Sequence, residues 1–360
     1  NQLIKKMTSN LGLKYSDILC SVIAGNTTMT HLFLGVVPEH IRLEPYIPAF
    51  GKTPTITAGD CGININPNAS VYLLPNVASY VGGDIVSGVL AAGFWNTEDI
   101  TLFLDLGTNG EIVLGSQDWM VTCACSAGPA FEGGEISCGM RAALGAIDKI
   151  AINKASLKPT YKVIGNIKPK GICGSGLIDL IAEMFLSGII DRRGKLVQST
   201  QNTQVRYDSN MDCLEYVVVY GKETDDGRDI TINEVDIDNF LRAKGAVYSG
   251  IRTLLNNVGL DVSNIDQVII AGGIGQNLDI RNSVILGLLP DIDIEKYDFI
   301  GNSSLTGAYA SLISQEAREK AQNIADMMTY IELSADPKYM EEFISACFLP
   351  HTDIGLFPSL

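Results

Sequence analysis

One carboxylate, Asp105, stands inside an apolar run just before a glycine turn, in the stretch LDLGTNGEIVLG at residues 104–115. A carboxylate in such a run requires a cation or a set of hydrogen-bond donors, because burial of an unpaired charge is unfavourable. A magnesium ion that carries nucleotide phosphates would satisfy it. The turn itself can direct backbone amides at an anion, from Gly107, Thr108, Asn109 and Gly110. An Asn-Gly pair between two strands is also typical of a plain hairpin turn, so the carboxylate is what favours a phosphate site.

A second turn of this kind, GNTT at residues 25–28, also follows a strand-like run. Amides that converge at such a turn can bind an anion. We expect Asn26 and Thr27 to face the same cleft as the turn at residues 107–110. A plain turn is the alternative interpretation of this stretch.

Hydrophobic spacing predicts the elements that hold these turns. Residues 1–12 predict a helix, and residues 17–29 predict a strand, a polar turn and a helix. Residues 99–115 predict a two-stranded hairpin and residues 118–128 a third strand, whereas the stretch 195–232 is polar and predicts an irregular insertion. The remaining elements are helices at residues 82–94, 173–191 and 235–260 and strands at residues 69–79 and 265–271. This order predicts an α/β fold with a mixed sheet.

Composition excludes several classes of function. The 360 residues are 46% hydrophobic and 19% charged, which predicts a sizeable core in two lobes. A net charge of -15 offers no basic stripe for nucleic acid. There is neither a signal-peptide pattern nor an apolar run long enough for a membrane helix. Eight scattered cysteines without repeated CxxC spacing and three dispersed histidines indicate buried thiols in a reducing, cytoplasmic setting rather than a metal centre.

The stretch DLGTNGEIVLG resembles the phosphate hairpin of the superfamily that contains actin, sugar kinases and the heat-shock chaperone ATPases. In that pattern the aspartate, here Asp105, reaches Mg2+ through water, and the Gly-Thr turn wraps the phosphates. The resemblance implies an α/β, actin-like (ribonuclease H-like) ATPase fold with two lobes that binds ATP and Mg2+.

Three further stretches resemble other motifs of this superfamily. IIAGGIGQNLDI is similar to the adenosine motif, in which the nucleoside lies against glycines, here Gly272, Gly273 and Gly275. GICGSGLIDLIAEM and FIGNSSLTGAYASL are similar to the two connecting helices that meet at the hinge between the lobes. Their glycines Gly174 and Gly307 are the implied nucleotide-side positions.

A narrower resemblance lies in the stretches IAGNTTMTHLFLG, SAGPAFEGGEISCGMRAA, RAKGAVYSGIRTLL and ELSADPKYMEEFISACFLPHTD. They are similar to the ATP-dependent reductive activators of corrinoid proteins, which are ferredoxin-like proteins with a large C-terminal ATPase-type domain. This resemblance covers essentially the whole chain. It implies an enzyme that uses ATP to drive an electron onto the cobalt(II) of a methyltransferase corrinoid protein, which restores cobalt(I). The implied partners are that corrinoid protein and an electron donor. A homodimer is a further alternative.

Glu132, in PAFEGGE, is a candidate for the residue that orients the water attacking ATP. A glutamate in a surface loop is the alternative interpretation.

Two parts of the family pattern are not matched by these residues: the N-terminal [2Fe-2S] domain and the phosphate hairpin that opens the first lobe. We therefore expect a partial first lobe over residues 1–96, a second lobe over residues 97–331 that includes the insertion, and a C-terminal extension over residues 332–360. We expect [2Fe-2S] only outside these residues, and weak ATP binding by these residues alone because half of the phosphate contacts would be missing.

Two other functions fit the same fold. The first is a small-molecule kinase, for which the sequence offers no sugar or acid motif. The second is a non-catalytic, nucleotide-dependent scaffold of a ferredoxin-like iron-sulfur protein. The hairpin and loop residues that an ATPase site needs are present, which argues against loss of that site. They are Asp105, Gly107, Thr108, Gly272 and Gly273.

Overall fold

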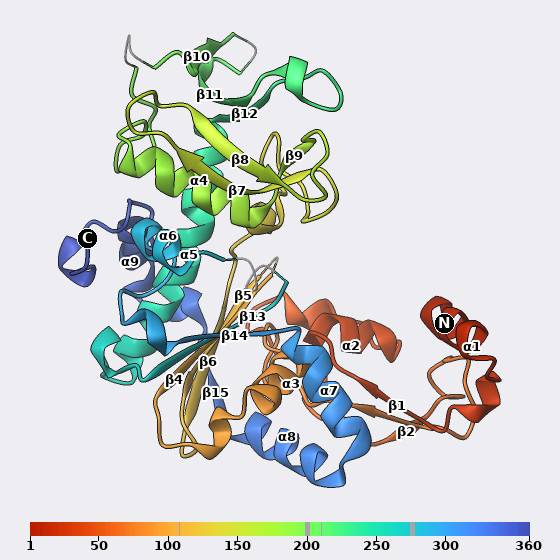
Figure 1. Cartoon of the computed structure of the whole chain (residues 1–360). Helices are drawn as coiled ribbons and strands as arrows, with labels where there is room; N and C mark the ends of the chain where they lie inside the picture. The colour runs from red at the N-terminus through yellow and green to blue at the C-terminus, as the bar shows by residue number, and fades with distance from the viewer. Residues whose placement is uncertain (108, 199–201, 210, 274–277) are drawn as a thin grey trace. The chain divides into compact units, whose positions relative to one another are not determined.

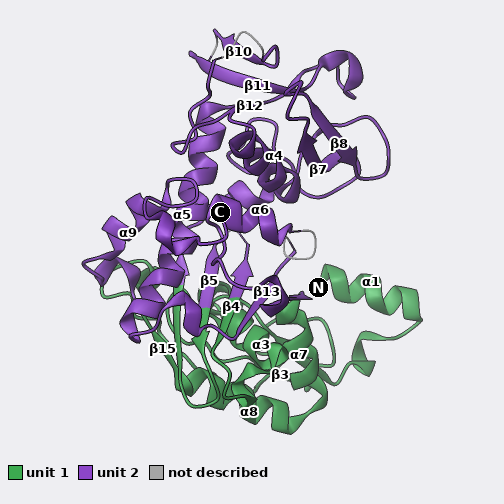
Figure 2. Ribbon diagram, turned by 60° about the vertical axis from the view of Figure 1, so that its left-hand side comes forward, with its two compact units in different colours: residues 1–103, 113–123, 302–331 green, residues 104–112, 124–301, 332–360 purple. Residues whose placement is uncertain are grey.

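The structure is a computed structural model of the chain, and it describes residues 1–107, 109–198, 202–209, 211–273 and 278–360 (Figure 1). Two predicted site residues, Thr108 and Gly275, lie outside the described residues. The chain divides into two compact units (Figure 2). Unit 1 contains residues 1–103, 113–123 and 302–331, and unit 2 contains residues 104–112, 124–301 and 332–360.

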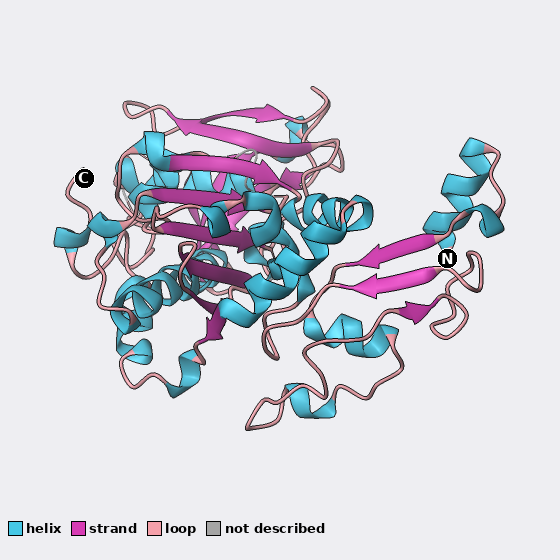
Figure 3. Ribbon diagram, turned by 90° about the horizontal axis from the view of Figure 1, so that it is seen from below, coloured by secondary structure: helices cyan, strands magenta, loops and turns pink. Residues whose placement is uncertain are grey.

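Unit 1 combines helices with a small sheet (Figure 3). In this sheet β1 pairs parallel with β3, and β2 pairs antiparallel with β3. The helices and strands of this unit are α1 (Gln2–Leu11), β1 (Cys20–Ile23), α2 (Thr27–Phe33), β2 (Ile56–Thr57), β3 (Ser70–Leu73), α3 (Gly83–Ala92), α7 (Ser303–Ile313), α8 (Gln315–Met327) and β15 (Met328–Tyr330).

The described residues of unit 2 form two three-stranded sheets and four α-helices. One sheet has the order β8-β7-β9 and the other β10-β11-β12. The elements are β7 (Ala146–Ile152), β8 (Pro159–Val163), β9 (Gly171–Ile172), α4 (Gly174–Leu186), β10 (Val205–Asp208), β11 (Cys213–Val219), β12 (Ile230–Asn233), α5 (Glu234–Asn257), β13 (Gln267–Ala271), α6 (Ile280–Leu286), β14 (Tyr297–Gly301) and α9 (Tyr339–Ala346).

A six-stranded sheet carries the predicted hairpin. Its strand order is β14-β13-β4-β5-β6-β15, and its central strands are β4 (Thr101–Leu106), β5 (Gly110–Gly115) and β6 (Met120–Cys125). The prediction of a hairpin followed by a third strand is therefore confirmed. Residues 101–104 of β4 are all buried, which is typical of a central strand that is covered on both faces.

The prediction that residues 195–232 are irregular is wrong, because β10, β11 and β12 form an antiparallel sheet there, and that the segment is an insertion stays a prediction. The core of this sheet is the run Tyr216–Val219 in β11, whose residues are at most 3% exposed. The polar turn ETDDGRD dominates the composition of the segment and conceals this short apolar run. The sheet β7–β9 and helix α8 are also absent from the sequence-based prediction.

Helix α5 begins where the sequence supplies a strong N-terminal cap. The Asn233 side chain accepts hydrogen bonds from the amides of Val235 and Asp236, and the Asp236 carboxylate accepts one from the Asn233 amide. This reciprocal capping satisfies amides that the first turn of a helix leaves without partners. None of the helices in the described part of the chain combines the length and the apolar character that crossing a bilayer requires.

Lys244, in the middle of α5, is fully buried. Its ammonium group donates hydrogen bonds to the carbonyl oxygens of Phe348 and of Pro350, the latter at 2.7 Å. Burial lowers the pKa of Lys244 to about 7, and the nearby Cys347 acts in the opposite direction. The buried cation thus ties the C-terminal segment to α5 at an electrostatic cost.

We expect the stability of the protein to rise between pH 7 and pH 9 because of Lys244. The folded state holds this proton less tightly than the unfolded chain, so the penalty is fully present below pH 7 and disappears as the pH rises towards the unfolded value. Urea unfolding of the wild type and Lys244→Met at pH 7, 8 and 9 measures the effect, which is about 2 kcal/mol over this interval. Equal pH slopes for the two proteins would contradict this assignment.

Candidate functional site

Asp105 is the next-to-last residue of β4 and is half-buried. In the turn that follows, the amide of Gly107 donates to the carbonyl of Asn109 at 3.0 Å. The turn closes tightly because the Cys125 thiol donates to the carbonyl of Gly110 at 3.0 Å. Burial, the largest cause, raises the pKa of Cys125 to about 12, so this thiol stays protonated and acts as a structural donor.

Gly272 brings the end of β13 against this hairpin within unit 2. Its φ is +92°, and a Cβ atom there would lie 2.8 Å from the Leu106 carbonyl oxygen and 2.9 Å from Asp105 Oδ1. Only glycine tolerates both this conformation and this approach. The next residue, Gly273, has nothing within 4 Å of a Cβ position. The backbone of Gly272 therefore lies directly against the hairpin that carries Asp105.

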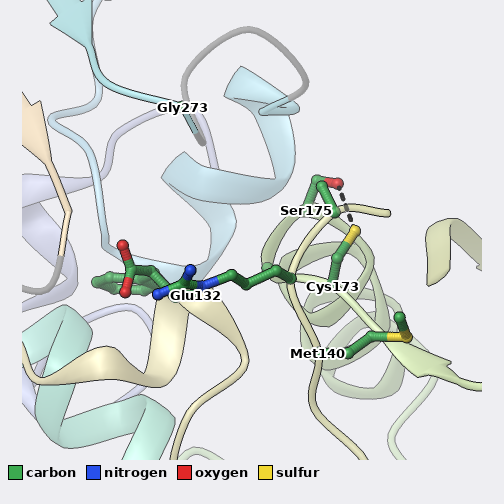
Figure 4. A pocket seen from close by; sticks show the side chains of 9 residues that line it. Glu132, Met140, Cys173, Ser175 and Gly273 are labelled. Atoms are coloured by element: carbon green, nitrogen blue, oxygen red, sulfur yellow. Dashed lines mark hydrogen bonds between the residues drawn. The ribbon is translucent and has the colours of Figure 1, made fainter. Parts of the chain in front are cut away.

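A pocket of about 270 Å³ lies in unit 2 beside Gly273 (Figure 4). It is lined by Phe131, Glu132, Met140, Arg141, Ala142, Cys173, Gly174, Ser175 and Gly273. Figure 4 shows Cys173 and Ser175 together at the start of α4, joined by a hydrogen bond of 3.5 Å, with Glu132 on a different segment of the wall. The pocket thus gathers three segments that are distant in the sequence.

The segment that carries Glu132 is shaped by close backbone contacts. Glu132 ends the short 3-10 helix η4 (Pro129–Glu132) and is half-buried. A Cβ on Gly133 would lie 2.4 Å from the Met140 amide, and one on Gly139 would lie 2.2 Å from the Gly133 carbonyl. The loop therefore folds back on itself and holds Glu132 and Met140 at the same pocket.

Gly174, the first residue of α4, also needs to be glycine. A Cβ there would lie 1.9 Å from the Phe131 carbonyl oxygen, so the start of α4 packs directly on η4. The predicted site residues Glu132, Gly174 and Gly273 thus line one pocket, and Asp105 adjoins it through Gly272.

The other predicted site residues lie in unit 1, where their side chains have local partners. Asn26 caps α2 by accepting from the Met29 amide at 2.8 Å, and the Thr27 hydroxyl donates to the Ala78 carbonyl at 2.6 Å. A Cβ on Gly307 would lie 2.0 Å from the Ser87 carbonyl, so this glycine allows α7 to pack closely on α3. A nucleotide role for these residues would have to use the backbone, and it stays a prediction.

The residues beside Asp105 fit a magnesium ion that is held mainly by water and phosphate. Magnesium in nucleotide sites uses one or two carboxylates and keeps several waters. Among the described residues, no cluster of three or more histidine, cysteine or acidic side chains could enclose a metal. A single carboxylate at the mouth of a glycine-lined turn matches this requirement.

The sequence interpretation missed six residues of the pocket wall: Phe131, Met140, Arg141, Ala142, Cys173 and Ser175. Five of them lie in SCGMRAA and GICGSG, which belong to stretches that carry the resemblances described above. Their spacing gave no signal for a shared wall, because only the folded loop and β9 bring the stretches together.

Comparison with known families identifies the chain. A family model described as the C-terminal domain of RACo, the ASKHA domain, matches residues 99–360. The chain belongs to the RACo family. A model of the RACo middle region matches residues 1–97, and the actin-like fold predicted from the motifs is confirmed.

The names of similar proteins refer to corrinoid activation or to reduction of a corrinoid protein. "Corrinoid activation enzyme RamQ" of Eubacterium limosum is 34% identical over 349 residues, which are 95% of this chain and 58% of that protein. A "[Co(II) methylated amine-specific corrinoid protein] reductase" of Methanosarcina barkeri is 24% identical over 73% of this chain and 48% of its own length. A solved "Reductive activator for corrinoid,iron-sulfur protein" superposes with a TM-score of 0.91 at 52% identity, covering 100% of this chain and 57% of that one. This chain therefore spans about half the length of these relatives.

Proposed function

We propose that the protein uses ATP to drive the reduction of a corrinoid protein from cobalt(II) to cobalt(I). The observation that carries this proposal is the close approach of Gly272 to Asp105, which joins a phosphate-type hairpin to an adenosine-type loop in a member of the RACo family. The names of the relatives, which refer to corrinoid activation and reduction, supply the substrate class.

In this proposal one electron passes from an iron-sulfur donor to cobalt(II). ATP is needed because the transfer is uphill for such a donor. Water attacks the γ-phosphorus, the bond to the β-phosphate oxygen breaks, and ADP and phosphate leave. Nucleotide binding and hydrolysis then favour one of two conformational states through different affinities for each state.

The residues of this chain take separate parts in nucleotide binding. Asp105 would hold Mg2+ through water, and this ion neutralises charge on the phosphates. The amides of the hairpin turn would contact the phosphates, and the Gly272–Gly273 backbone would lie against the nucleoside. Further proposed contacts with the nucleotide come from Asn26, Thr27, Gly174 and Gly307.

Glu132 is proposed to orient the attacking water. We expect Glu132→Gln to lower the turnover number for ATP by about 10- to 100-fold with little change in KM, because the change removes a proton acceptor and preserves shape. Steady-state phosphate release measures both constants. Glu135→Gln is the matched control, since Glu135 is an exposed residue of the same loop. A turnover number equal to that of the wild type would remove Glu132 from the mechanism.

The proposed function is tested by reconstitution. The full-length protein is mixed without oxygen with a cobalt(II) corrinoid protein and a chemical electron donor, and cobalt(I) is followed by its absorbance. We expect cobalt(I) to accumulate with Mg-ATP and not with a non-hydrolysable analogue. Cobalt(I) formation at the same rate without nucleotide would refute the role of ATP, and phosphorylation of a small molecule would favour the kinase alternative.

A further inference from the structure

Arg141 has a fixed backbone and an exposed, charged side chain at the wall of the unit 2 pocket. The preceding residue, Met140, donates its amide hydrogen to the Ile172 carbonyl at 2.9 Å, and the Ile172 amide donates to the Cys138 carbonyl at 2.8 Å. These bonds pair the end of the loop with β9. The position from which the Arg141 side chain extends is therefore set by backbone pairing.

The Arg141 guanidinium forms no hydrogen bond or ion pair with any residue that the structure describes, and the residue is exposed. Most other arginines of unit 2 are engaged; Arg206, for example, pairs with Glu215 and Asp229. A guanidinium carries five donors in a planar fork that suits phosphate oxygens. Arg141 thus presents an unused phosphate-binding group.

The charge of the pocket wall points in the same direction. Of the nine lining residues, only Glu132 and Arg141 carry charge. The chain as a whole has a net charge of -15, so its overall field disfavours a polyanionic ligand. A local cation would favour a nucleotide in this pocket, and Arg141 is the cationic residue among those that line it.

We propose that Arg141 binds the nucleotide phosphates and favours ATP over nucleotides with fewer phosphates. This inference rests on the proposed nucleotide site. Arg141 lies on the loop that carries Glu132 and lines the same pocket as Gly273, and Gly273 follows the residue that contacts Asp105. Mg2+ at Asp105 and the guanidinium of Arg141 would then neutralise the polyphosphate together.

The test compares nucleotide affinities of the full-length protein by isothermal titration with Mg-ATP, Mg-ADP and AMP. We expect Arg141→Gln to raise the Kd for ATP on the order of 10- to 100-fold, that for ADP less, and that for AMP within about 2-fold. Arg141→Lys should lie between these values and the wild type, because lysine keeps the charge and loses the fork. Arg242→Gln is the matched control, since Arg242 is exposed on α5 and pairs with Asp238. The circular dichroism and Tm of each variant confirm that it is folded.

Three outcomes overturn the inference. An unchanged Kd for ATP in folded Arg141→Gln would show that the guanidinium makes no phosphate contact. An equal loss for ATP, ADP and AMP would place Arg141 at the base or ribose. In both cases loss of Mg-dependent turnover in Asp105→Ala would leave the proposed ATPase site standing. If the wild type binds none of the three nucleotides, the inference and the proposed function fail together.

Discussion

Asp105→Ala is expected to abolish Mg2+-dependent ATP turnover, with a loss of about 100-fold or more. The single carboxylate beside the Gly272 backbone is the group proposed to hold the ion, and without it the negative charge on the phosphates is not neutralised. The fold should persist, because Asp105 is half-buried at the end of a strand whose core residues are unchanged. Phosphate release over a range of Mg2+ concentrations, beside a thermal melt, measures the two effects.

Asp118→Ala is the matched control for Asp105→Ala. Asp118 is an exposed carboxylate in the turn between β5 and β6, so its removal changes the net charge equally without touching the site. Retention of full ATP turnover by folded Asp105→Ala would refute the assigned role of the aspartate.

Gly272→Ala is expected to destabilise the protein by about 2 to 4 kcal/mol and to remove ATP turnover with it. The backbone at this position has a φ of +92°, which alanine disfavours. The added methyl group would also overlap the Leu106 carbonyl and Asp105 Oδ1. Relief of this overlap would have to displace Asp105 or the end of β13. Urea unfolding gives the loss of stability, and phosphate release at a temperature where the variant is folded gives the loss of activity.

Gly273→Ala separates this close contact from a general effect of added side chains. It adds the same methyl group one residue later, where nothing lies within 4 Å of the Cβ position. We expect its free energy of unfolding to stay within about 0.5 kcal/mol of the wild type. Equal destabilisation by the two changes would contradict the close contact between Gly272 and the hairpin.

Local patterns were sufficient to predict the elements whose signals are short-range. The hairpin of β4 and β5 follows from two apolar runs on either side of an Asn-Gly turn, and α5 follows from its spacing. The motif resemblance also gave the actin-like fold, which is confirmed. The predicted domain boundaries after residues 96 and 331 stay a prediction.

The rest depends on contacts between distant segments. Strand β11 was not predicted from the sequence, because its apolar run is short and polar turns surround it. The need for glycine at residues 174 and 307 comes from carbonyls of other elements, Phe131 and Ser87, which no local pattern contains. Arg141 was not predicted as a site residue, because its place on a pocket wall depends on the pairing of its loop with the distant strand β9.

Helix α5 and strand β12 are continuous, since Asn233 is both the last residue of the strand and the cap of the helix. No linker residue separates the strand from the helix, so we expect a rotation of α5 to move the sheet β10–β12 with it. At 1.5 Å per residue, the 24 residues of α5 extend about 36 Å, and a tilt of about 5° would carry one end about 3 Å relative to the other. Helix α5 also contacts the pocket loop, because Asp236 in its first turn accepts hydrogen bonds from the amide and hydroxyl of Ser137. A displacement of that loop would therefore be transmitted directly to the sheet β10–β12, because both are joined to the first turn of α5.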